Sequence, residues 1–396
     1  MLGSGEFPPP EPGMRFILFR GSSLYGSVDR MLDSLAAALI ALGDAAPIID
    51  ATAPDYIVRL QQAITDGPVD AFLGFSGIGL DQRAEGNLYN ALEKPLVTIY
   101  LDPLLLYWNQ VATPIRRRLI FTTAPGDLEY WRGKLGVPVP LKHLPHAATA
   151  LPAGTAPMPW AARDIDLLHA GTAPADPAAL RAAWAEHGPK VEGRLNAMLD
   201  AHDADPFAPL PDIIARVGHP VAALASPQSL YPYFQTLDLY LRARVRWRMV
   251  AALLGHPLTL VGPGWETVVA AAAAGPVRAR LLGTRSAAEV AELVARTRIV
   301  VNSCTPYHGS HERLFQAMAA GAVAFSSATA WLGETAPADV LAQVRPDLSD
   351  VAAPADGLLQ DPARAETMAE AGRAWFEGAH TWAHRAATIR AAVAAL

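Results

Sequence analysis

Short apolar runs alternate with amphipathic stretches along most of the chain. The first run, 14–19, is broken only by Arg15 and leads through a small-residue loop, 21–23, into a helical stretch, 28–42. A strand, a loop and a helix in this order form the repeating unit of a parallel α/β layer. Each expected strand is apolar on both faces, as strands inside a parallel sheet are. The strands expected in this half are 14–19, 46–50, 69–75, 96–101, 118–122 and 141–144.

The same pattern restarts after a proline-rich segment. We interpret residues 151–162 as an interdomain linker, because prolines and small residues dominate 151–160. Two Rossmann-like α/β domains are therefore expected, an N-terminal one at 14–150 and a C-terminal one at 163–375. The strands expected in the second domain are 165–169, 258–261, 280–282, 299–303 and 322–326, with helices at 287–295 and 312–320.

Two regions depart from the strand–helix alternation. Residues 177–254 show apolar residues at helical spacing, with prolines at 206–211 and 220–232, and predict a helical insertion with interruptions at these prolines. The end of the chain predicts one or two helices, with Gly372 and Gly378 as weak points. Residues 1–13 contain Gly-Ser and Glu-Phe pairs typical of cloning sites, so we treat them as a tag and expect Met14 to be the natural start.

Composition narrows the class of protein. A length of 396 residues suits two domains, and 51% hydrophobic residues exclude global disorder. The net charge of −6 argues against a dedicated nucleic-acid binder, which normally carries a basic face. The single cysteine, Cys304, can form no intramolecular disulfide and favours a cytoplasmic location. Neither a signal peptide nor an apolar run long enough for a transmembrane helix is expected.

The richest chemistry lies in 299–327. An expected strand ends at Asn302, a polar loop follows, and a helix opens near Ser310, which we expect to be its N-cap. The N-terminus of a helix presents unpaired N–H groups and the positive end of the helix dipole, so it can bind an anion such as a diphosphate. Arg313, one turn into the helix, could add a forked donor to a phosphate.

This segment resembles the donor-site region of GT-B-fold glycosyltransferases, most closely the CgeB-like or group 1 branch. The similarity rests on Asn302, Gly309, Arg313 and Phe315, followed by the small-residue run 317–321. The tail 380–385, His-Thr-Trp-Ala-His-Arg, resembles the His-Thr-aromatic-x-x-Arg ending of that branch. Segments 145–147, 170–172 and 261–265 fall where such enzymes carry their linker strand and glycine loops.

The resemblance implies two Rossmann-like parallel-sheet domains facing a cleft, with a C-terminal helix, 376–396, that crosses back to the first domain. It implies sugar transfer from a nucleotide-sugar to a glycan, protein or small-molecule acceptor near 21–23, Gly77 and Asp102, with no cofactor or metal besides the donor. The expected catalytic residues are Asp102, His311 and Glu312. The residues expected at the donor are Gly171, Gly262, Gly264, Gly283, Thr284, His308, Gly309, Ser310 and Arg313.

One feature departs from the family pattern. Many retaining GT-B enzymes carry a pair of glutamates where this chain has His308 and Gln316. Neither of these side chains is a carboxylate, which argues against a retaining mechanism of that type. Glu312 and His311 are the nearest ionisable substitutes.

Several alternatives remain open at this point. Cys304, His308 and His311 could hold a metal, contact the nucleotide-sugar or cap the loop. Asp102 could be a general base or a turn-initiating residue before proline. The four alternating arginines at 242–248 are expected on solvated surface, although one of them could reach a phosphate. For the whole chain, the alternatives are a non-catalytic glycan- or protein-binding module and a nucleotide-sugar epimerase of the same fold, which needs paired carboxylates.

Overall fold

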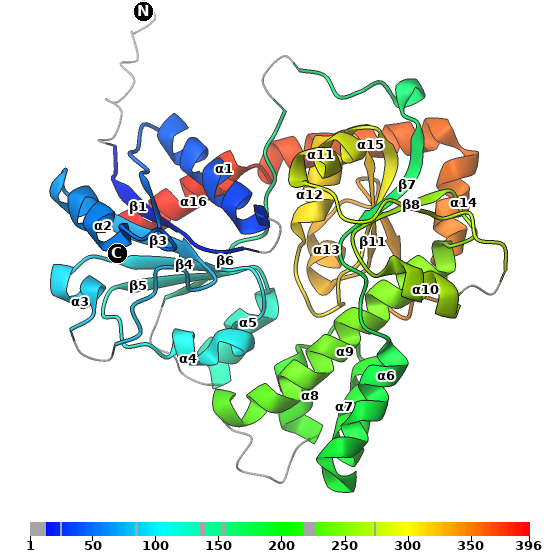
Figure 1. Cartoon of the computed structure of the whole chain (residues 1–396), viewed down its shortest axis with the longest axis horizontal. Helices are drawn as coiled ribbons and strands as arrows, with labels where there is room; N and C mark the ends of the chain where they lie inside the picture. The colour runs from blue at the N-terminus through cyan, green and yellow to red at the C-terminus, as the bar shows by residue number, and fades with distance from the viewer. Residues whose placement is uncertain are drawn as a thin grey trace, which may run out of the picture.

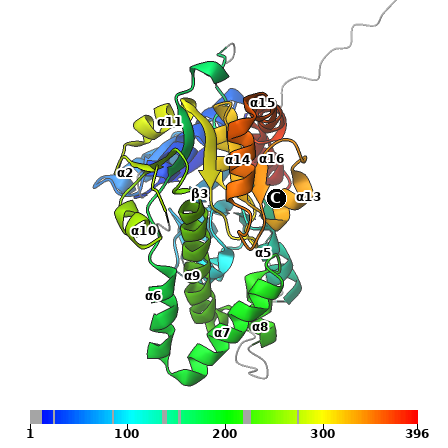
Figure 2. The ribbon, with the colours of Figure 1, turned by 90° about the vertical axis from the view of Figure 1, so that its right-hand side faces the viewer.

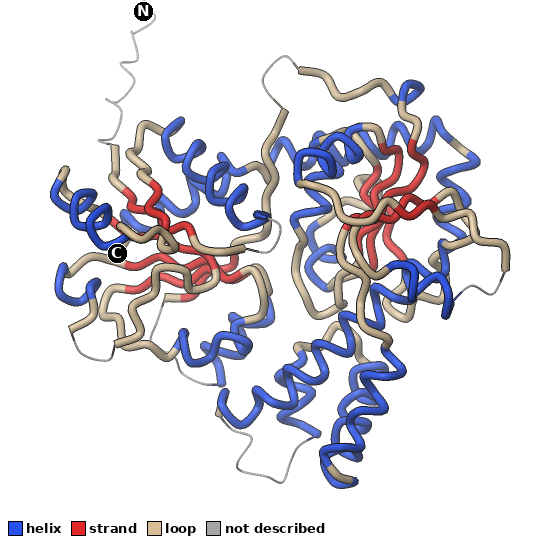
Figure 3. Tube along the Cα trace, in the orientation of Figure 1, coloured by secondary structure: helices blue, strands red, loops and turns tan. Residues whose placement is uncertain are grey.

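The structure is a computed structural model that describes residues 13–23, 26–83, 86–134, 140–151, 155–217, 226–272 and 275–396. Two six-stranded sheets lie side by side, each covered by helices, and every strand pair within them is parallel (Figure 1). Figure 3 shows the strands as two separate groups, with helices around each. The two parallel α/β layers that the sequence pattern predicts are therefore present.

The N-terminal sheet has the strand order β2-β1-β3-β4-β5-β6. Its strands are almost wholly buried, which explains why they read as continuous apolar runs. The strands are β1 Phe16–Arg20, β2 Ile48–Asp50, β3 Ala71–Phe75, β4 Leu96–Tyr100, β5 Arg118–Thr122 and β6 Leu141–His143. The helices are α1 Ser27–Ala41, α2 Tyr56–Thr65, α3 Leu88–Leu92, α4 Trp108–Val111 and α5 Pro125–Glu129, with short turns at Leu104–Tyr107 and Tyr130–Lys134.

The C-terminal sheet has the order β12-β11-β10-β7-β8-β9. Its edge strand β12 was not expected from the sequence, because its three residues are too short to show a pattern. The strands are β7 Ile165–Ala170, β8 Leu258–Val261, β9 Arg280–Leu281, β10 Thr297–Asn302, β11 Val323–Ser327 and β12 Ala342–Val344. The helices are α10 Trp265–Ala272, α11 Ala287–Ala295, α12 Glu312–Ala319, α13 Ala330–Thr335, α14 Ala352–Gln360 and α15 Pro362–Ala379.

Between β7 and β8 the chain forms a helical bundle below the two sheets (Figures 1 and 2). The expected interruption at 220–232 is wrong in part: the longest helix begins at Pro227, after a Ser226 capping box, and continues through Pro232. Pro227 stands in the first turn, where a helix leaves N–H groups unpaired, and Pro232 costs only one further hydrogen bond. Residues 218–225 lie outside the described part of the chain. The helices are α6 Pro177–Ala182, a short turn at Ala183–His187, α7 Pro189–Ala204, α8 Leu210–Val217 and α9 Pro227–Leu253.

The bundle shares a hydrophobic core with the N-terminal domain. Trp184 and Phe234 of the bundle pack in one buried cluster with Tyr100, Leu104 and Trp131. Burying large aromatic side chains removes much apolar surface from water, so this cluster joins the two halves of the chain. The other end of α9 reaches the C-terminal sheet, as Figure 2 shows. The bundle therefore connects both domains below the space between them.

The last helix, α16 (Trp382–Ala394), also joins the domains. It leaves α15 at a turn through His380 and packs against α1. Its Trp382 also meets Phe75, at the end of β3, with ring centroids 6.0 Å apart. The expected weak points at Gly372 and Gly378 are wrong, since α15 runs through both. A Cβ at Gly372 would lie 2.5 Å from the carbonyl oxygen of Val340, so this glycine allows close packing. Among the described residues, no helix is long and apolar enough to span a membrane.

Candidate functional site

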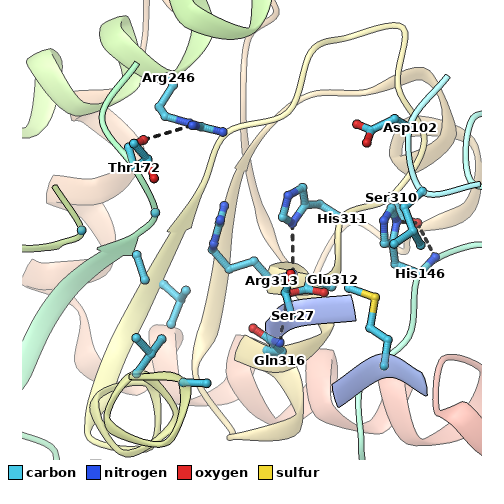
Figure 4. A pocket seen from close by; sticks show the side chains of 18 of the residues that line it. Ser27, Asp102, His146, Thr172, Arg246, Ser310, His311, Glu312, Arg313 and Gln316 are labelled. Atoms are coloured by element: carbon cyan, nitrogen blue, oxygen red, sulfur yellow. Dashed lines mark hydrogen bonds between the residues drawn. The ribbon is translucent and has the colours of Figure 1, made fainter. Parts of the chain in front are cut away.

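A cavity of about 510 Å³ lies between the carboxyl ends of the two sheets, where open α/β sheets place ligands. The N-terminal domain contributes the loops after β4 and β5 and the linker residue His146. The C-terminal domain contributes the loops after β7, β8 and β10 and the first turn of α12. Figure 4 shows Asp102 and His146 on one side of this space and Arg246 and Thr172 on the other.

Most of the residues expected at the site line this cavity. They are Asp102, Gly171, Gly262, Thr284, His308, Gly309, Ser310, His311, Glu312 and Arg313. Gly264 and Gly283 do not line it, although the carbonyl oxygen of Gly283 accepts from the Gly262 N–H at 2.8 Å and so shapes the wall. The loop 21–23 and Gly77, expected near the acceptor, do not line it either; α1 contributes Ser27, Arg30 and Met31. Which of these residues bind or react stays a prediction.

The loop before α12 meets the N-terminal domain at its backbone. A Cβ at Gly309 would lie 2.2 Å from the carbonyl oxygen of Thr123, so only glycine permits this approach. The expectation that Ser310 caps α12 is wrong. His311 is the N-cap, and its Nδ1 accepts from the Arg313 N–H at 3.2 Å. The Ser310 hydroxyl instead accepts from the N–H of His146 at 2.8 Å, which joins the loop to the segment that follows β6.

Two arginines approach each other in the cavity. Arg313 donates through Nη1 to Asn302 Oδ1 at 3.2 Å, and Arg246 donates through Nη1 to the Thr172 carbonyl oxygen at 3.1 Å. Burial, together with the positive charge of Arg313, lowers the pKa of Arg246 to about 10. Burial lowers the pKa of Arg313 as well. Both acceptors are neutral, so an anion bound here would relieve the repulsion between the two cations.

A third arginine, Arg242, bridges the two domains. Its Nη1 donates to Asp102 Oδ1 at 2.7 Å, and its Nε lies 2.7 Å from Asp238 Oδ2. Burial alone would raise the pKa of Asp238, but Arg242 and His308 lower it to about 2. The expectation that the arginines at 242–248 lie on solvated surface is thus wrong for Arg242 and Arg246. Their four-residue spacing places both on one face of α9.

The histidines of the site are neutral. Burial lowers the pKa of His146 to about 4, and burial together with Arg313 lowers the pKa of His311 well below its usual range. The two rings stack with centroids 5.8 Å apart. Burial and Arg242 also lower the pKa of His308, against the opposing effect of Asp238. Neutral imidazoles can each donate one hydrogen bond and accept another.

The other ionisable groups do not form a metal centre. No group of three or more His, Cys, Asp or Glu side chains among the described residues is arranged to hold a metal ion. Cys304 is buried, and burial raises the pKa of its thiol to about 12. The metal hypothesis for Cys304, His308 and His311 therefore has no geometric support. Burial also raises the pKa of Glu312, which accepts a hydrogen bond from Gln316 Nε2 at 3.3 Å.

A buried carboxyl group, Asp127, holds the loop that carries Asp102. Its Oδ2 accepts from the Leu104 N–H at 2.9 Å and from the Thr122 hydroxyl at 2.7 Å. Burial raises its pKa from 3.8 to about 7, despite these hydrogen bonds. The folded chain therefore keeps a proton on Asp127 between pH 4 and 7, where the unfolded chain has lost it.

We expect Asp127→Asn to flatten the pH dependence of stability. In the wild type, Asp127 lowers the free energy of unfolding progressively as pH rises from 4 to 7. Above pH 7 this loss is constant, on the order of 4 kcal/mol. Asparagine keeps the acceptor oxygen without the charge, so the variant should gain stability over the wild type as pH rises. Urea unfolding at pH 5 and pH 8 measures this, with exposed Asp55→Asn as the control. The same difference in unfolding free energy between Asp127→Asn and the wild type at both pH values would contradict this prediction.

The fold is that of the GT-B glycosyltransferases: two Rossmann-like domains facing a cleft, with a final helix packed on the first domain. Residues 242–391 match the model of a family described as glycosyl transferase-like. The matched region contains Arg246, the α12 loop and the tail 380–385. No curated protein matches the chain.

Solved structures agree with this class. Sucrose-phosphate synthase from Thermosynechococcus elongatus is 15% identical, with 97% of this chain and 100% of that chain covered and a TM-score of 0.56. HepE from Anabaena, in complex with UDP and glucose, is 11% identical, with 97% and 100% covered and a TM-score of 0.53. A glycosyltransferase from Rickettsia africae ESF-5 is 11% identical, with 96% and 98% covered and a TM-score of 0.51. The predicted GT-B fold is thereby confirmed.

Proposed function

We propose that this glycosyltransferase takes its sugar from a nucleotide-sugar whose diphosphate lies between Arg246, Arg313 and the first turn of α12. The observation that carries the proposal is the pair of half-buried guanidinium groups with neutral hydrogen-bond partners in one cavity. A bound diphosphate would place negative charge beside both guanidinium groups. The positive end of the α12 dipole would add to the attraction. The similarity in fold to HepE, which was crystallised with UDP, supports this choice of ligand.

The same groups would act on the chemical step. When the bond between the anomeric carbon and the diphosphate breaks, negative charge grows on the leaving phosphate oxygen. Arg313, Arg246 and the helix dipole are already in place to stabilise that charge, without reorganisation during the reaction. We propose that they do so without a metal ion.

On the opposite wall, the acceptor would approach from the N-terminal domain near Asp102. We propose a glycan, protein or small-molecule acceptor that offers a hydroxyl or amide, and a cytoplasmic location. We place the chain in the CgeB-like branch on the resemblance of the tail 380–385, whose last residue, Arg385, joins the tail to the segment after β6. Its guanidinium group donates to the carbonyl oxygens of Pro145 at 2.8 Å and His146 at 2.9 Å.

Thermal unfolding with UDP, GDP, ADP and the corresponding nucleotide-sugars tests the donor assignment. A ligand present at 100 times its dissociation constant stabilises the folded state by about 2.7 kcal/mol, so the matching nucleotide should raise Tm measurably. Arg246→Gln should abolish the shift. Arg244→Gln, which removes a cation of the same helix paired with Asp203 rather than lining the cavity, should preserve it. If no nucleoside diphosphate raises Tm, the donor assignment is wrong.

The same experiments separate the alternatives. An epimerase needs two carboxylates that act together in the cleft. The described lining residues contain two, but Asp102 is paired with Arg242 and Glu312 is hydrogen-bonded to Gln316 on a different side of the cavity (Figure 4). Conversion of a nucleotide-sugar to its epimer would nevertheless favour that activity. Glycan binding without any nucleotide effect would favour a non-catalytic module. Slow hydrolysis of one nucleotide-sugar, lost in Glu312→Ala, would favour the transferase.

A further inference from the structure

We infer that His308 is the catalytic residue that takes the proton from the incoming nucleophile, that Asp238 positions it, and that transfer proceeds with inversion at the anomeric carbon. The inference rests on the proposed function and extends it to the proton acceptor and the stereochemical outcome. His308 lines the cavity from the loop before α12, and Asp238 lies on α9 behind it.

The position of Asp238 favours one form of the imidazole. His308 Nε2 is buried and has no hydrogen-bond partner of good geometry, and the acceptor that faces it is Asp238 Oδ1 at 3.4 Å, on a side chain that is only 6% exposed. An ionised carboxylate can only accept hydrogen bonds, so Nε2 carries the proton and Nδ1 keeps the lone pair. Contacts of this kind are often long before substrate binds and shorten in the reactive complex. The arrangement is that of a base oriented by a carboxylate.

Asp238 is itself held by neighbours that keep it ionised. The Tyr307 hydroxyl donates to its Oδ1 at 2.8 Å, and Arg242 Nε lies 2.7 Å from its Oδ2. A buried carboxylate with these partners cannot easily rotate away from His308 or take up its proton. Asp238 therefore serves as a fixed orienting group.

The other histidines of the cavity are less suited to take the proton. His311 Nδ1 accepts from the Arg313 N–H, so its other ring nitrogen bears the proton and can only donate. His146 Nδ1 lies 3.1 Å from the Ser310 hydroxyl, which also accepts from the His146 backbone N–H, so this ring nitrogen is engaged by the loop. His146 has no carboxylate beside it to orient its ring, in contrast to His308.

The carboxylates of the cavity are also less suited to the task. Asp102 Oδ1 accepts a hydrogen bond from the Arg242 guanidinium at 2.7 Å, so one of its two oxygens is already engaged. Figure 4 shows Glu312 beside Ser27 of α1 and Gln316, on a different side of the cavity from Asp102. His308 is the lining residue whose ring has a buried carboxylate beside it.

Sugar transfer forms one bond at the anomeric carbon, breaks another and moves one proton. The acceptor oxygen attacks the anomeric carbon, the bond from that carbon to the diphosphate oxygen breaks, and its electron pair leaves with the nucleoside diphosphate. The acceptor proton passes to His308 Nδ1, and Asp238 stabilises the imidazolium. The leaving group would lie at Arg246 and Arg313, opposite the wall that carries Asp102 and His146 (Figure 4). Attack from the opposite side to the leaving group inverts the anomeric carbon.

The stereochemical test uses UDP-α-glucose, UDP-α-N-acetylglucosamine and GDP-α-mannose with water as acceptor. Proton NMR during the first turnovers should show the β-anomer of the released sugar before mutarotation. His308→Gln should lower this rate by about 10²-fold or more while the Tm shift with UDP or GDP is kept. Asp238→Asn should lower kcat more than KM and move the pH profile. Asp203→Asn, which removes an exposed partner of Arg244 in the same bundle, should leave both kcat and the pH profile unchanged. Release of the α-anomer first would overturn the inference.

A second measurement needs no turnover. Nitrogen-15 NMR of histidine-labelled protein, with His308→Gln to assign the resonance, should show His308 protonated at Nε2 in the wild type and a mixture of tautomers in Asp238→Asn. A proton on Nδ1 in the wild type would overturn the inference even if no sugar is released. If the tautomer is as expected and no nucleotide raises Tm, the donor assignment fails while the orientation of His308 by Asp238 stands.

Discussion

Arg313→Gln is expected to lower the rate of sugar transfer by about 10²–10³-fold, the usual cost of removing one donor aimed at a developing negative charge. Glutamine can keep a hydrogen bond to Asn302 but carries no charge. The buried site excludes much of the water that would otherwise screen the leaving diphosphate, so the lost charge cannot be replaced. Because Arg313 stands in the first turn of α12 and is not part of the apolar core, the variant should fold normally.

Initial rates of nucleotide-sugar hydrolysis and calorimetric binding of the nucleoside diphosphate measure the effect of Arg313→Gln. Arg313→Lys should recover part of the binding but less of the rate, since an ammonium group keeps the charge without the planar fork. The control is Arg298→Gln, which breaks an ion pair with Asp166 and does not line the cavity. If Arg313→Gln hydrolyses the nucleotide-sugar at the wild-type rate, the assignment of Arg313 to the donor site is wrong.

The fold was largely predictable, because most of its strands are buried on both faces and separated by amphipathic helices. Strands β3, β5 and β8 lie where the apolar runs placed them, within a few residues. The strand that was missed, β12, is a three-residue edge strand with Gln343 at its centre. The equally short β2 was expected because it stands in the run 46–50, so a short strand is found only where apolar neighbours extend its pattern.

The loop before α12 was identified from its own residues as part of the candidate site, and it lines the cavity, but its partners on α9 were not identified. Arg242 and Arg246 were interpreted as surface residues because they alternate with Arg244 and Arg248. Together with Asp238 they are spaced four residues apart, which places all three on one face of α9. That spacing was the available signal. The sequence could not indicate that this face meets a cavity 140 residues away in the chain at Asp102.

The cap of α12 shows a second limit. Ser310 is the better N-cap by residue type, yet the linker at His146, 164 residues away, engages its hydroxyl, and His311 takes the capping position. A tertiary contact has overridden a local preference. Neither the tautomers of His146 and His311 nor the orientation of His308 could follow from the sequence, because each depends on such a partner.

We expect Arg385→Leu to destabilise the fold strongly while sparing the side chains that line the cavity. Arg385 is 5% exposed and donates to three carbonyl oxygens, those of Pro145, His146 and Ala379, and to His380 Nδ1. These bonds join the start of α16 to residues 145–146, in the segment that follows β6. A buried acceptor left unpaired costs about 1–3 kcal/mol, so the loss should reach roughly 3 kcal/mol or more even if water enters.

Thermal and urea unfolding of Arg385→Leu, with limited proteolysis of the linker, measure this loss. The shape of leucine fills part of the space, so the effect isolates the lost donors from a simple cavity. Arg373→Leu is the matched control, since it removes the same side chain from an i,i+4 pair with Glu377 on the preceding helix. Such pairs contribute only about 0.3–0.5 kcal/mol. Equal loss of stability in the two variants would mean that α16 is held by its apolar contacts with α1 alone, and that the final arginine of the tail has another role.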